Sequence, residues 1–223
     1  MISSRDNEKL KLVRKLQERR WRDKLGLFVC EGEDLLDAAT APAVELLIAG
    51  ENVEPALLAE VSSAAHPPRV VAVFRRDDLP ASEPRPATLA LWRVADPGNV
   101  GTLIRTADAF GASVALSDGC ADPTSPKALR ASAGSIWRVP IGRFDGTWTG
   151  ARRVGLVASG GIPLDEADLT GPTVLLLGAE REGLPDSVAR DLDVSIRIAG
   201  AESLNVTAAG AVALYEWRRQ NPG

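Results

Sequence analysis

The sequence has few of the residues that build metal sites, disulfide frameworks or membrane spans. Its 223 residues include two cysteines, Cys30 and Cys120, and one histidine, His66. The cysteines form no CxxC motif and follow no secretory signal, so we expect reduced thiols rather than a disulfide. No Cys/His cluster has the spacing of a zinc site, and we expect no structural metal. No apolar run reaches the ~20 residues that span a bilayer, so we expect a cytoplasmic protein without a membrane segment.

Aromatic residues are also scarce, and the overall charge is slightly negative. Aromatic side chains make up 4% of the chain, which argues against a broad platform for stacking single-stranded bases. The formal net charge of −4 excludes a generally basic nucleic-acid coat. The average hides a local excess, because residues 1–25 hold nine Lys or Arg against four acids, a local charge of +5. The apolar share of 45% is that of a globular protein with a sizeable core.

The first third of the chain has the pattern of a small α/β unit. It begins with an amphipathic helix that has Leu10, Val13, Leu16 and Gln17 on its apolar side and is expected to end near Gly26. The other side of this helix is cationic. Short strand-like and helix-like segments then alternate as far as the run RVVAVF, which is typical of an α/β arrangement.

A proline-rich stretch separates this unit from a second one. LPASEPRPA has three prolines in nine positions, which disfavours helix and central strand, so residues 81–87 are predicted to be a linker. We therefore expect domains at 1–80 and 88–223. The second unit has strand-like runs TLALWRV, SVALS, RRVGLVAS, TVLLLGAE and VSIRIAG, with helices near 99–110, 125–132, 186–191 and 204–219. Its Val, Leu and Ile runs without polar alternation predict parallel strands with both faces covered.

Three stretches of the second unit carry polar residues where a strand or turn leads into a helix. They are DPGNVGTLIRTADAFGA (96–112), LLLGAEREGLP (175–185) and AGAESLNVTAAGAVALYEW (199–217). Open α/β sheets bind ligands at the carboxyl ends of their strands, so the three stretches are candidates for one shared site. The first begins like a nucleotide-binding loop but lacks GxGxxG or P-loop spacing, which argues against a dinucleotide-binding oxidoreductase.

Each of these polar residues also has an ordinary structural explanation. Asn99 and Ser203 could be helix N-caps, Glu180 a solvated loop acid and Arg105 a surface residue. Arg105 fits a surface position least well, because apolar residues such as Ile104 surround it. The Ala-Ala-Gly-Ala start of the final helix suits close helix packing, in a core or in a dimer interface.

Taken together, the three stretches resemble, in order, the three motifs of the SpoU (TrmH-like) family of RNA ribose 2′-O-methyltransferases, in the SPOUT superfamily. The segment SPKALRASAGSIWRVPI is similar to the family's connecting segment, and the start of the chain is similar to its small substrate-binding domain. The resemblance implies an α/β methyltransferase domain, with a trefoil knot, a parallel sheet and helices on both faces, that binds S-adenosylmethionine and works as a homodimer. A catalytically silent RNA-binding relative is the alternative, although such a protein would need none of the polar motif residues.

The resemblance also implies roles for individual residues. The family's catalytic arginine matches Arg105, which could act as a base or, since a guanidinium has a pKa above ~12, as a clamp on a phosphate. The polar residues implied to complete this catalytic cluster are Asn99, Glu180, Ser203 and Asn205. The positions that match cofactor contacts, or lie beside them, are Leu177, Gly178, Ile198, Gly200 and Leu204. For Ile198, a place in the ordinary core at the strand end is the alternative.

The basic N-terminal helix is predicted to recruit the RNA, with a solvated charged face as the alternative. The cations expected to contact phosphates are Arg14, Lys15, Arg19, Arg20 and Arg22. Trp21 could stack on a base. The added N-terminal domain favours ribosomal RNA over transfer RNA. At the other end, the final helix combines small residues with a bulky apolar end, which predicts that part of it packs against a second subunit.

Overall fold

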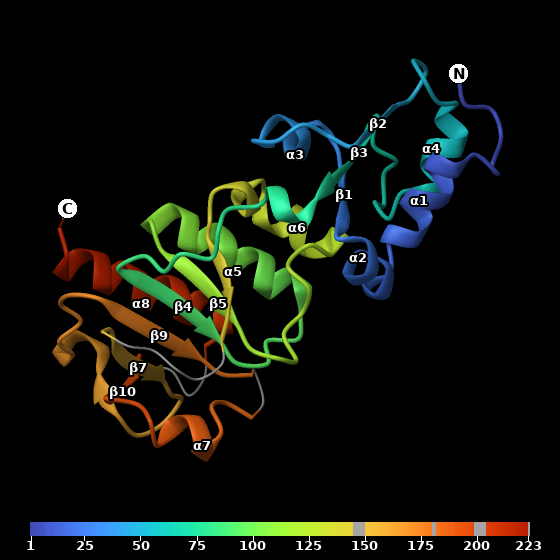
Figure 1. The fold of residues 1–223 in the computed structure, drawn as a ribbon. Coiled ribbons are helices and arrows are strands. Elements are labelled where there is room, and N and C mark those ends of the chain that lie inside the picture. The colour runs from blue at the N-terminus through green and yellow to red at the C-terminus, as the bar shows by residue number, and fades with distance from the viewer. Residues whose placement is uncertain (145–149, 180–181, 199–203, 223) are drawn as a thin grey trace.

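The computed structural model describes residues 1–144, 150–179, 182–198 and 204–222. Its elements build a smaller β-sheet near the N-terminus and a larger one toward the C-terminus, with α6 (Pro126–Ser132) beside the smaller sheet (Figure 1). Three predicted site residues, Glu180, Gly200 and Ser203, lie outside the described residues. Over the described ranges, no helix is both long and apolar enough to cross a membrane.

The basic N-terminal segment forms two helices rather than the single expected one. Helix α1 (Glu8–Leu16) buries Leu10, Val13 and Leu16 completely, as the apolar spacing predicts. The chain leaves helical geometry at Glu18, and α2 (Arg19–Leu25) follows. Helix α2 ends at Gly26, as predicted, with this glycine in the left-handed conformation.

The smaller sheet and the helices between its strands follow the alternating pattern that the sequence predicts. They are β1 (Leu27–Glu31), α3 (Glu33–Asp37), β2 (Glu45–Ile48), α4 (Pro55–Val61) and β3 (Val70–Arg75). The last strand, β3, lies in the middle and pairs antiparallel with both neighbours, in the order β1-β3-β2. A 3₁₀ turn, η1 (Arg76–Asp78), follows, and residues 79–86 contain no helix or strand.

The larger sheet is entirely parallel among its described strands, as the uninterrupted Val, Leu and Ile runs predict. Its order is β6-β5-β4-β9-β7-β10-β8. The expected strands are β4 (Ala87–Leu91), β5 (Ser113–Leu116), β7 (Arg152–Leu156), β9 (Thr173–Leu177) and β10 (Val194–Arg197). Two short strands were not predicted, β6 (Ile141–Arg143) and β8 (Ile162–Pro163). Both lie at an edge of the sheet, where a strand of two or three residues leaves little periodicity to detect.

Helices cover both faces of this sheet. Helices α5 (Pro97–Phe110) and α8 (Val206–Gln220) pack against each other and against the central strands β4 and β9. On the opposite face, Ala90, Val174 and Leu176 pack with Leu184 and Val188, the latter from α7 (Asp186–Ala189). The chain therefore has an α/β fold with a parallel sheet enclosed on two sides.

The two sheets share one hydrophobic core. Phe28 of β1 and Phe74 of β3 pack against Trp137 of the 3₁₀ turn η2 (Ser135–Trp137), with ring centroids 5.7 and 4.8 Å from that of Trp137. All three side chains are buried in the same cluster as Leu89 of the larger sheet. Removing the N-terminal residues would therefore expose part of the core on which the larger sheet depends.

Candidate functional site

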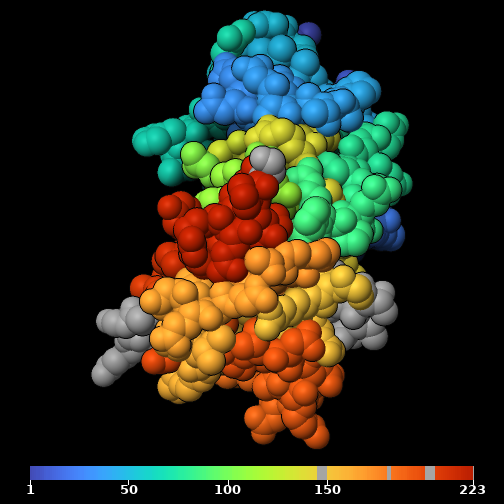
Figure 2. All heavy atoms as spheres, turned by 90° about the vertical axis from the view of Figure 1, so that its left-hand side faces the viewer, coloured from blue at the N-terminus to red at the C-terminus, as the bar shows by residue number. Residues whose placement is uncertain are grey.

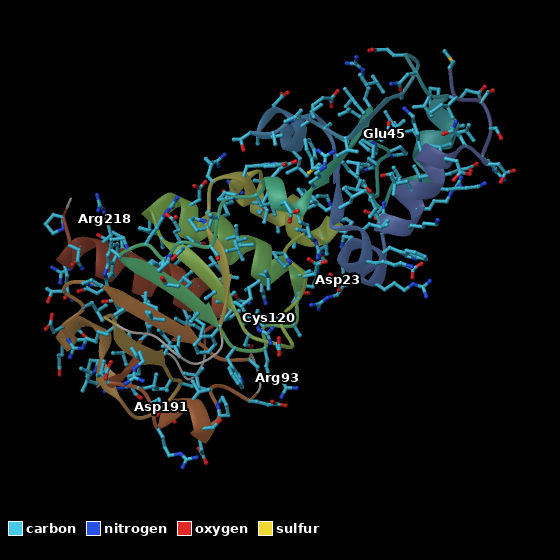
Figure 3. The ribbon with its side chains drawn as sticks, viewed as in Figure 1. Asp23, Glu45, Arg93, Cys120, Asp191 and Arg218 are labelled. Carbon is cyan, nitrogen blue, oxygen red and sulfur yellow. The ribbon has the colours of Figure 1, made fainter. Side chains whose placement is uncertain are left out.

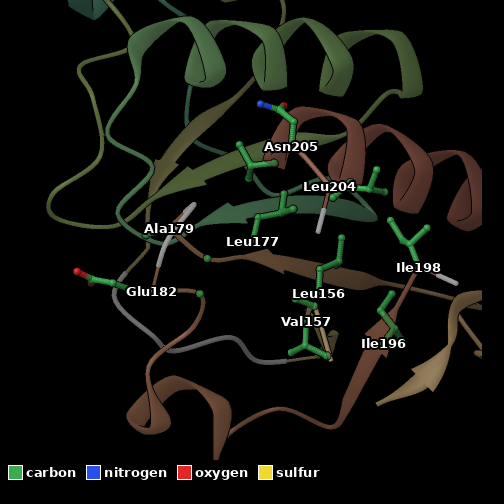
Figure 4. Close-up of a pocket in the computed structure, with 14 residues that line it drawn as sticks. Leu156, Val157, Leu177, Ala179, Glu182, Ile196, Ile198, Leu204 and Asn205 are labelled. Atoms are coloured by element: carbon green, nitrogen blue, oxygen red, sulfur yellow. The ribbon is translucent and has the colours of Figure 1, made fainter. Parts of the chain in front are cut away.

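A cavity of about 470 Å³ lies beyond the carboxyl ends of β7, β9 and β10 (Figure 4). This is within the ~300–1,000 Å³ typical of small-molecule and cofactor sites. Its apolar wall consists of Leu156, Val157, Leu177, Ile196, Ile198 and Leu204. Gly178, Ala179, Glu182 and Gly183, with Ala158 and the start of α8, complete the lining among the described residues. The cavity occupies the edge of the sheet that the three motif stretches predict.

Four of the five positions predicted to contact a cofactor line this cavity. Leu177 is the last residue of β9 and Gly178 follows it, while Ile198 follows β10 and Leu204 precedes α8. Ile198 is half-buried, and it both packs against the main hydrophobic core and lines the cavity. The fifth, Gly200, lies outside the described residues.

Gly178 is required by the chain's own backbone. A Cβ atom at this position would lie 2.2 Å from the carbonyl carbon of Gly183 and 2.5 Å from the backbone nitrogen of Leu184. The Gly183 amide donates to the Ala179 carbonyl at 2.8 Å, which closes a tight loop. The absence of a side chain at Gly178 therefore lets the backbone of Gly183 and Leu184 approach the end of β9 closely.

Asp96, rather than Asn99, caps the first motif helix. The Asp96 carboxylate accepts from the Asn99 backbone amide at 3.0 Å, and Pro97 occupies the first helical turn. Lys127 donates to the same carboxylate at 2.7 Å. The Lys127 hydrogen bond, then the Asn99 amide, lower the pKa of Asp96 below its ordinary value. Asn99 is half-buried at the third position of the helix, so its side chain is not the N-cap.

Asn205 has both a capping role and a place at the cavity. Its side-chain oxygen accepts from the backbone amide of Thr207 at 2.9 Å, which caps α8. The same residue lines the cavity, with Leu204 beside it (Figure 4). The third motif thus uses a single asparagine to start a helix and to present a polar group at the cavity.

Arg105 is exposed and is not among the described residues that line the cavity. Its neighbours Leu103 and Ile104 are fully buried on the other side of α5. Of these two predicted catalytic residues, the cavity lining therefore includes Asn205 and not Arg105. The arginine is instead presented on the outer side of a helix that packs against α8.

Two of the five predicted RNA-binding cations, Lys15 and Arg20, lie around Trp21, together with Lys24. Lys15 and Lys24 each place their ammonium group 5.2 Å from the Trp21 ring centroid, and the Arg20 guanidinium carbon lies 5.6 Å away. We call these four residues the Trp21 cluster. Lys24 was not among the predicted RNA-binding cations. Lys24 follows Arg20 by four residues, which places both side chains on the same side of α2.

The other three predicted cations have different environments. Arg14 is half-buried and donates to the carbonyl of Arg5. Arg19 is exposed and donates to the carbonyl of Cys120 at 3.3 Å.

Arg22 is a buried structural residue. Its side chain is 4% exposed and its Nε lies 2.7 Å from the Asp122 carboxylate, which is 6% exposed. A second guanidinium nitrogen donates to the carbonyls of Leu16 and Gln17 at 2.8 and 2.9 Å. The prediction that Arg22 contacts RNA phosphates is therefore wrong. Arg22 is buried, and its ion pair with Asp122 joins α2 to the larger unit.

Asp122 is the shared partner at this junction. Arg76 donates to the same carboxylate at 2.9 Å, and the Thr124 hydroxyl donates to its other oxygen at 2.7 Å. Burial by itself would raise the pKa of Asp122, but Thr124, Arg76 and Arg22 together lower it below the ordinary value. The carboxylate is therefore ionised at neutral pH and holds two arginines of the N-terminal unit.

A parallel sheet with a glycine-bounded cavity beyond its strand ends defines a cofactor-binding α/β domain. The model of the SpoU rRNA Methylase family matches residues 86–215. A tRNA/rRNA methyltransferase of Synechocystis, itself uncharacterized, is 33% identical over 98% of this chain and 93% of its own. The 23S rRNA (guanosine(2553)-2′-O)-methyltransferase RlmP of Bacillus subtilis is 31% identical over 97% of this chain and 98% of its own.

The fold is equally similar to solved structures. The AdoMet-bound rRNA methyltransferase of Sinorhizobium meliloti superposes with a TM-score of 0.85 and 29% identity, over 100% of this chain and 98% of that one. This chain belongs to the SpoU rRNA methylase family.

Proposed function

We propose that this chain is an S-adenosylmethionine-dependent methyltransferase that acts on the ribose 2′-hydroxyl of RNA, and of ribosomal RNA in particular. The observation that supports this most is the cavity, because four separately predicted cofactor positions meet there. The similarity to RlmP, whose name gives 23S rRNA as its substrate, favours ribosomal over transfer RNA. The test is transfer of a labelled methyl group from S-adenosylmethionine to the ribose of an unmethylated rRNA transcript.

The cavity residues fit an adenosine-containing cofactor. Leu177, Ile198 and Leu204 offer aliphatic surface to a flat base, and the backbone at Gly178 and Ala179 offers polar groups to its edge. When bound, S-adenosylmethionine supplies an electrophilic methyl group on its sulfonium. The chain's task is then to orient the ribose hydroxyl in line with that methyl group and to assist loss of the hydroxyl proton.

Arg105 is proposed to hold an RNA phosphate next to the reacting ribose. A guanidinium offers two parallel N–H donors to a phosphate and stays charged as the ribose oxygen becomes anionic. Proton removal by Arg105 itself is the alternative, and the high pKa of a guanidinium disfavours it. Asn99 and Asn205, with Glu180 and Ser203, are proposed to orient the arginine and the ribose.

Residues 1–80 are proposed to act as an RNA-binding domain and 88–223 as the methyltransferase domain, joined by 81–87. The Trp21 cluster supports this, since its cations are exposed, with Lys15 near the end of α1 and Arg20 and Lys24 on α2. The protein would work in the cytoplasm, where ribosomal RNA is available. The trefoil knot is also part of this proposal and rests on the family resemblance alone.

Replacing Lys15 and Lys24 with alanine should weaken RNA binding by about tenfold and lower the salt-dependence exponent by roughly 1 to 2, because two phosphate contacts are lost. Filter binding of an rRNA transcript over a salt series measures both quantities. Point substitutions are preferable to deleting the domain, since deletion would expose Trp137.

The matched control for this experiment replaces Lys9 and Lys11 with alanine. These cations lie on α1 and are paired with Glu45 and Glu8, at 2.7 and 3.1 Å. The control should bind RNA almost as the wild-type chain does. Equal losses in the two double variants would show that total charge, and not the Trp21 cluster, attracts RNA.

We propose that the chain forms a homodimer through the exposed side of α8. The two sides of this helix have different environments. Gly210 faces α5, where a Cβ atom would lie 2.6 Å from the Leu103 side chain, so part of the pattern is explained by packing within the chain. On the other side, Val212 is 40% exposed and Tyr215 is 61% exposed. Helix α8, in red, lies at the surface in Figure 2. A second subunit on this side would cover apolar surface and could approach Arg105.

Val212→Glu should produce folded monomers that have lost methyl transfer, because an unpaired carboxylate in an apolar interface is costly to desolvate. Sedimentation velocity at micromolar concentration, with circular dichroism, measures assembly and folding separately. Leu46→Glu is the control, since Leu46 is a comparably exposed apolar residue of β2, 38% exposed. A wild-type chain that is fully active as a monomer would contradict the dimer proposal.

A further inference from the structure

We infer that a phosphate-binding track leads from the Trp21 cluster to the cavity and that Arg93 is its cation nearest the cavity. The inference rests on the proposed function, because it concerns how RNA reaches the site. It adds a residue, Arg93, that neither the motifs nor the cavity lining identifies. Figure 3 shows Asp23 of α2, Cys120 and Arg93 along one side of the molecule, with Arg218 at the other end.

Contacts along the segment 117–120 connect α2 to Arg93. Arg19 of α2 donates to the Cys120 carbonyl at 3.3 Å. Next to Cys120, a Cβ atom at Gly119 would lie 3.2 Å from both Cγ and Nε of Arg93. The Arg93 backbone amide also donates to the Ser117 hydroxyl at 2.9 Å. One short loop therefore has Arg19 at one end and the Arg93 side chain lying along it.

Arg93 is also connected to the cavity wall through its neighbour Trp92. The backbone amide of Trp92 donates to the Leu177 carbonyl at 2.8 Å, and Leu177 lines the cavity. Arg93 therefore follows directly after the residue that ties β4 to the cavity strand β9. An RNA phosphate held by its exposed guanidinium would place a neighbouring nucleotide near the carboxyl edge of the sheet.

The acidic residues around this loop are already paired with other cations. Asp118 pairs with Arg143 at 2.9 Å, and Asp96 pairs with Lys127 at 2.7 Å. Asp122 is buried between Arg22 and Arg76. Arg19 lies 3.6 Å from Asp23, an exposed pair that phosphate can displace. The guanidinium of Arg93 makes no ion pair with any residue in the described part of the chain, so its charge is available.

The backbone conformation of Arg93 is one that glycine adopts more easily than arginine. Its φ is +52°, in the left-handed region that favours glycine. Ala133 is the one other non-glycine residue with positive φ among those described. Glycine would adopt this φ without strain, so the backbone conformation itself does not favour an arginine at this position. A bidentate contact to an RNA phosphodiester is the chemistry that suits it.

Arg93→Gly separates an RNA-binding role from a structural one. Glycine adopts the observed φ without strain, so the thermal midpoint should not fall, and the affinity for S-adenosylmethionine should be unchanged. Binding of an unmethylated 23S rRNA transcript at about 0.1 M salt should weaken by roughly five- to tenfold, with the salt exponent lower by about 1. Arg93→Lys should keep the salt exponent but recover only part of the affinity, because a point charge replaces a fork.

Arg218→Ala is the matched control. Arg218 is an exposed cation at the opposite end of the molecule and donates only to the Asn221 carbonyl among described partners. The Arg218→Ala variant should bind the transcript with the affinity of the wild-type chain. The track is overturned if Arg93→Gly binds RNA with wild-type affinity and salt dependence, or if Arg218→Ala loses as much. Failure of the wild-type chain to methylate the transcript would instead count against the proposed function and leave the binding comparison valid.

Discussion

Arg105→Ala is expected to abolish methyl transfer, a loss of at least about 10²- to 10³-fold in kcat, because the variant lacks the group proposed to hold the RNA phosphate and to stabilise the developing ribose oxyanion. Arg105 is exposed on α5, so its removal should leave the free energy of unfolding within about 0.5 kcal/mol of wild type. Cofactor affinity should change little, because Arg105 does not line the cavity in the chain. Single-turnover methyl transfer and calorimetric titration of S-adenosylmethionine measure the two effects separately.

Arg105→Lys distinguishes the phosphate clamp from a simple charge requirement. Lysine keeps the positive charge but cannot make two parallel hydrogen bonds to one phosphate. We expect it to fail nearly as badly as alanine. Substantial activity in the lysine variant would remove the bidentate clamp from the mechanism.

Asp122→Ala is expected to lower the free energy of unfolding by about 3–5 kcal/mol, because it leaves Arg22 buried without its partner. The control is Asp118→Ala, whose carboxylate pairs with Arg143 at the surface with both side chains more than 70% exposed. That exposed pair should contribute no more than about 1 kcal/mol. Urea unfolding at neutral pH measures both values, and equal losses would contradict the structural role of Asp122.

The pH dependence of stability provides a second check on Asp122. Its pKa is lowered in the folded chain, so its contribution is present above the ordinary carboxyl pKa of about 4. That contribution is lost as the pH falls through the lower folded value. In Asp122→Asn this part of the acid destabilisation should be missing. An unchanged acid profile would show that the carboxylate is not selectively stabilised by folding.

The sequence predicts those parts of the fold that depend on local patterns. The mainly apolar runs of β4 and β9, without polar alternation, predict central parallel strands, and the i, i+3 spacing on α1 predicts its buried side. The pairing of the smaller sheet could not be predicted in this way. Strand and helix segments alternate there, yet β3 inserts between β1 and β2 in antiparallel orientation, which depends on contacts between distant segments.

More of the candidate cofactor site could be predicted from the sequence than of the proposed RNA-binding surface. Gly178, Ile198 and Leu204 were selected by resemblance, and the structure places them at one cavity. Arg22 could not be distinguished from its exposed neighbours, because its partner Asp122 is 100 residues away in the chain. Arg93 gave no signal either, since a positive φ at a non-glycine residue is a property of the folded backbone.

The measurement that tests the central claim most directly is the chemical location of the transferred methyl group. Purified wild-type chain would be incubated with methyl-labelled S-adenosylmethionine and an unmethylated 23S rRNA transcript, and the RNA digested to nucleosides for mass spectrometry. The proposed function predicts that the label appears in a single 2′-O-methylnucleoside and that Arg105→Ala produces none. Label on a base, or no label in RNA that the protein binds together with its cofactor, would contradict it.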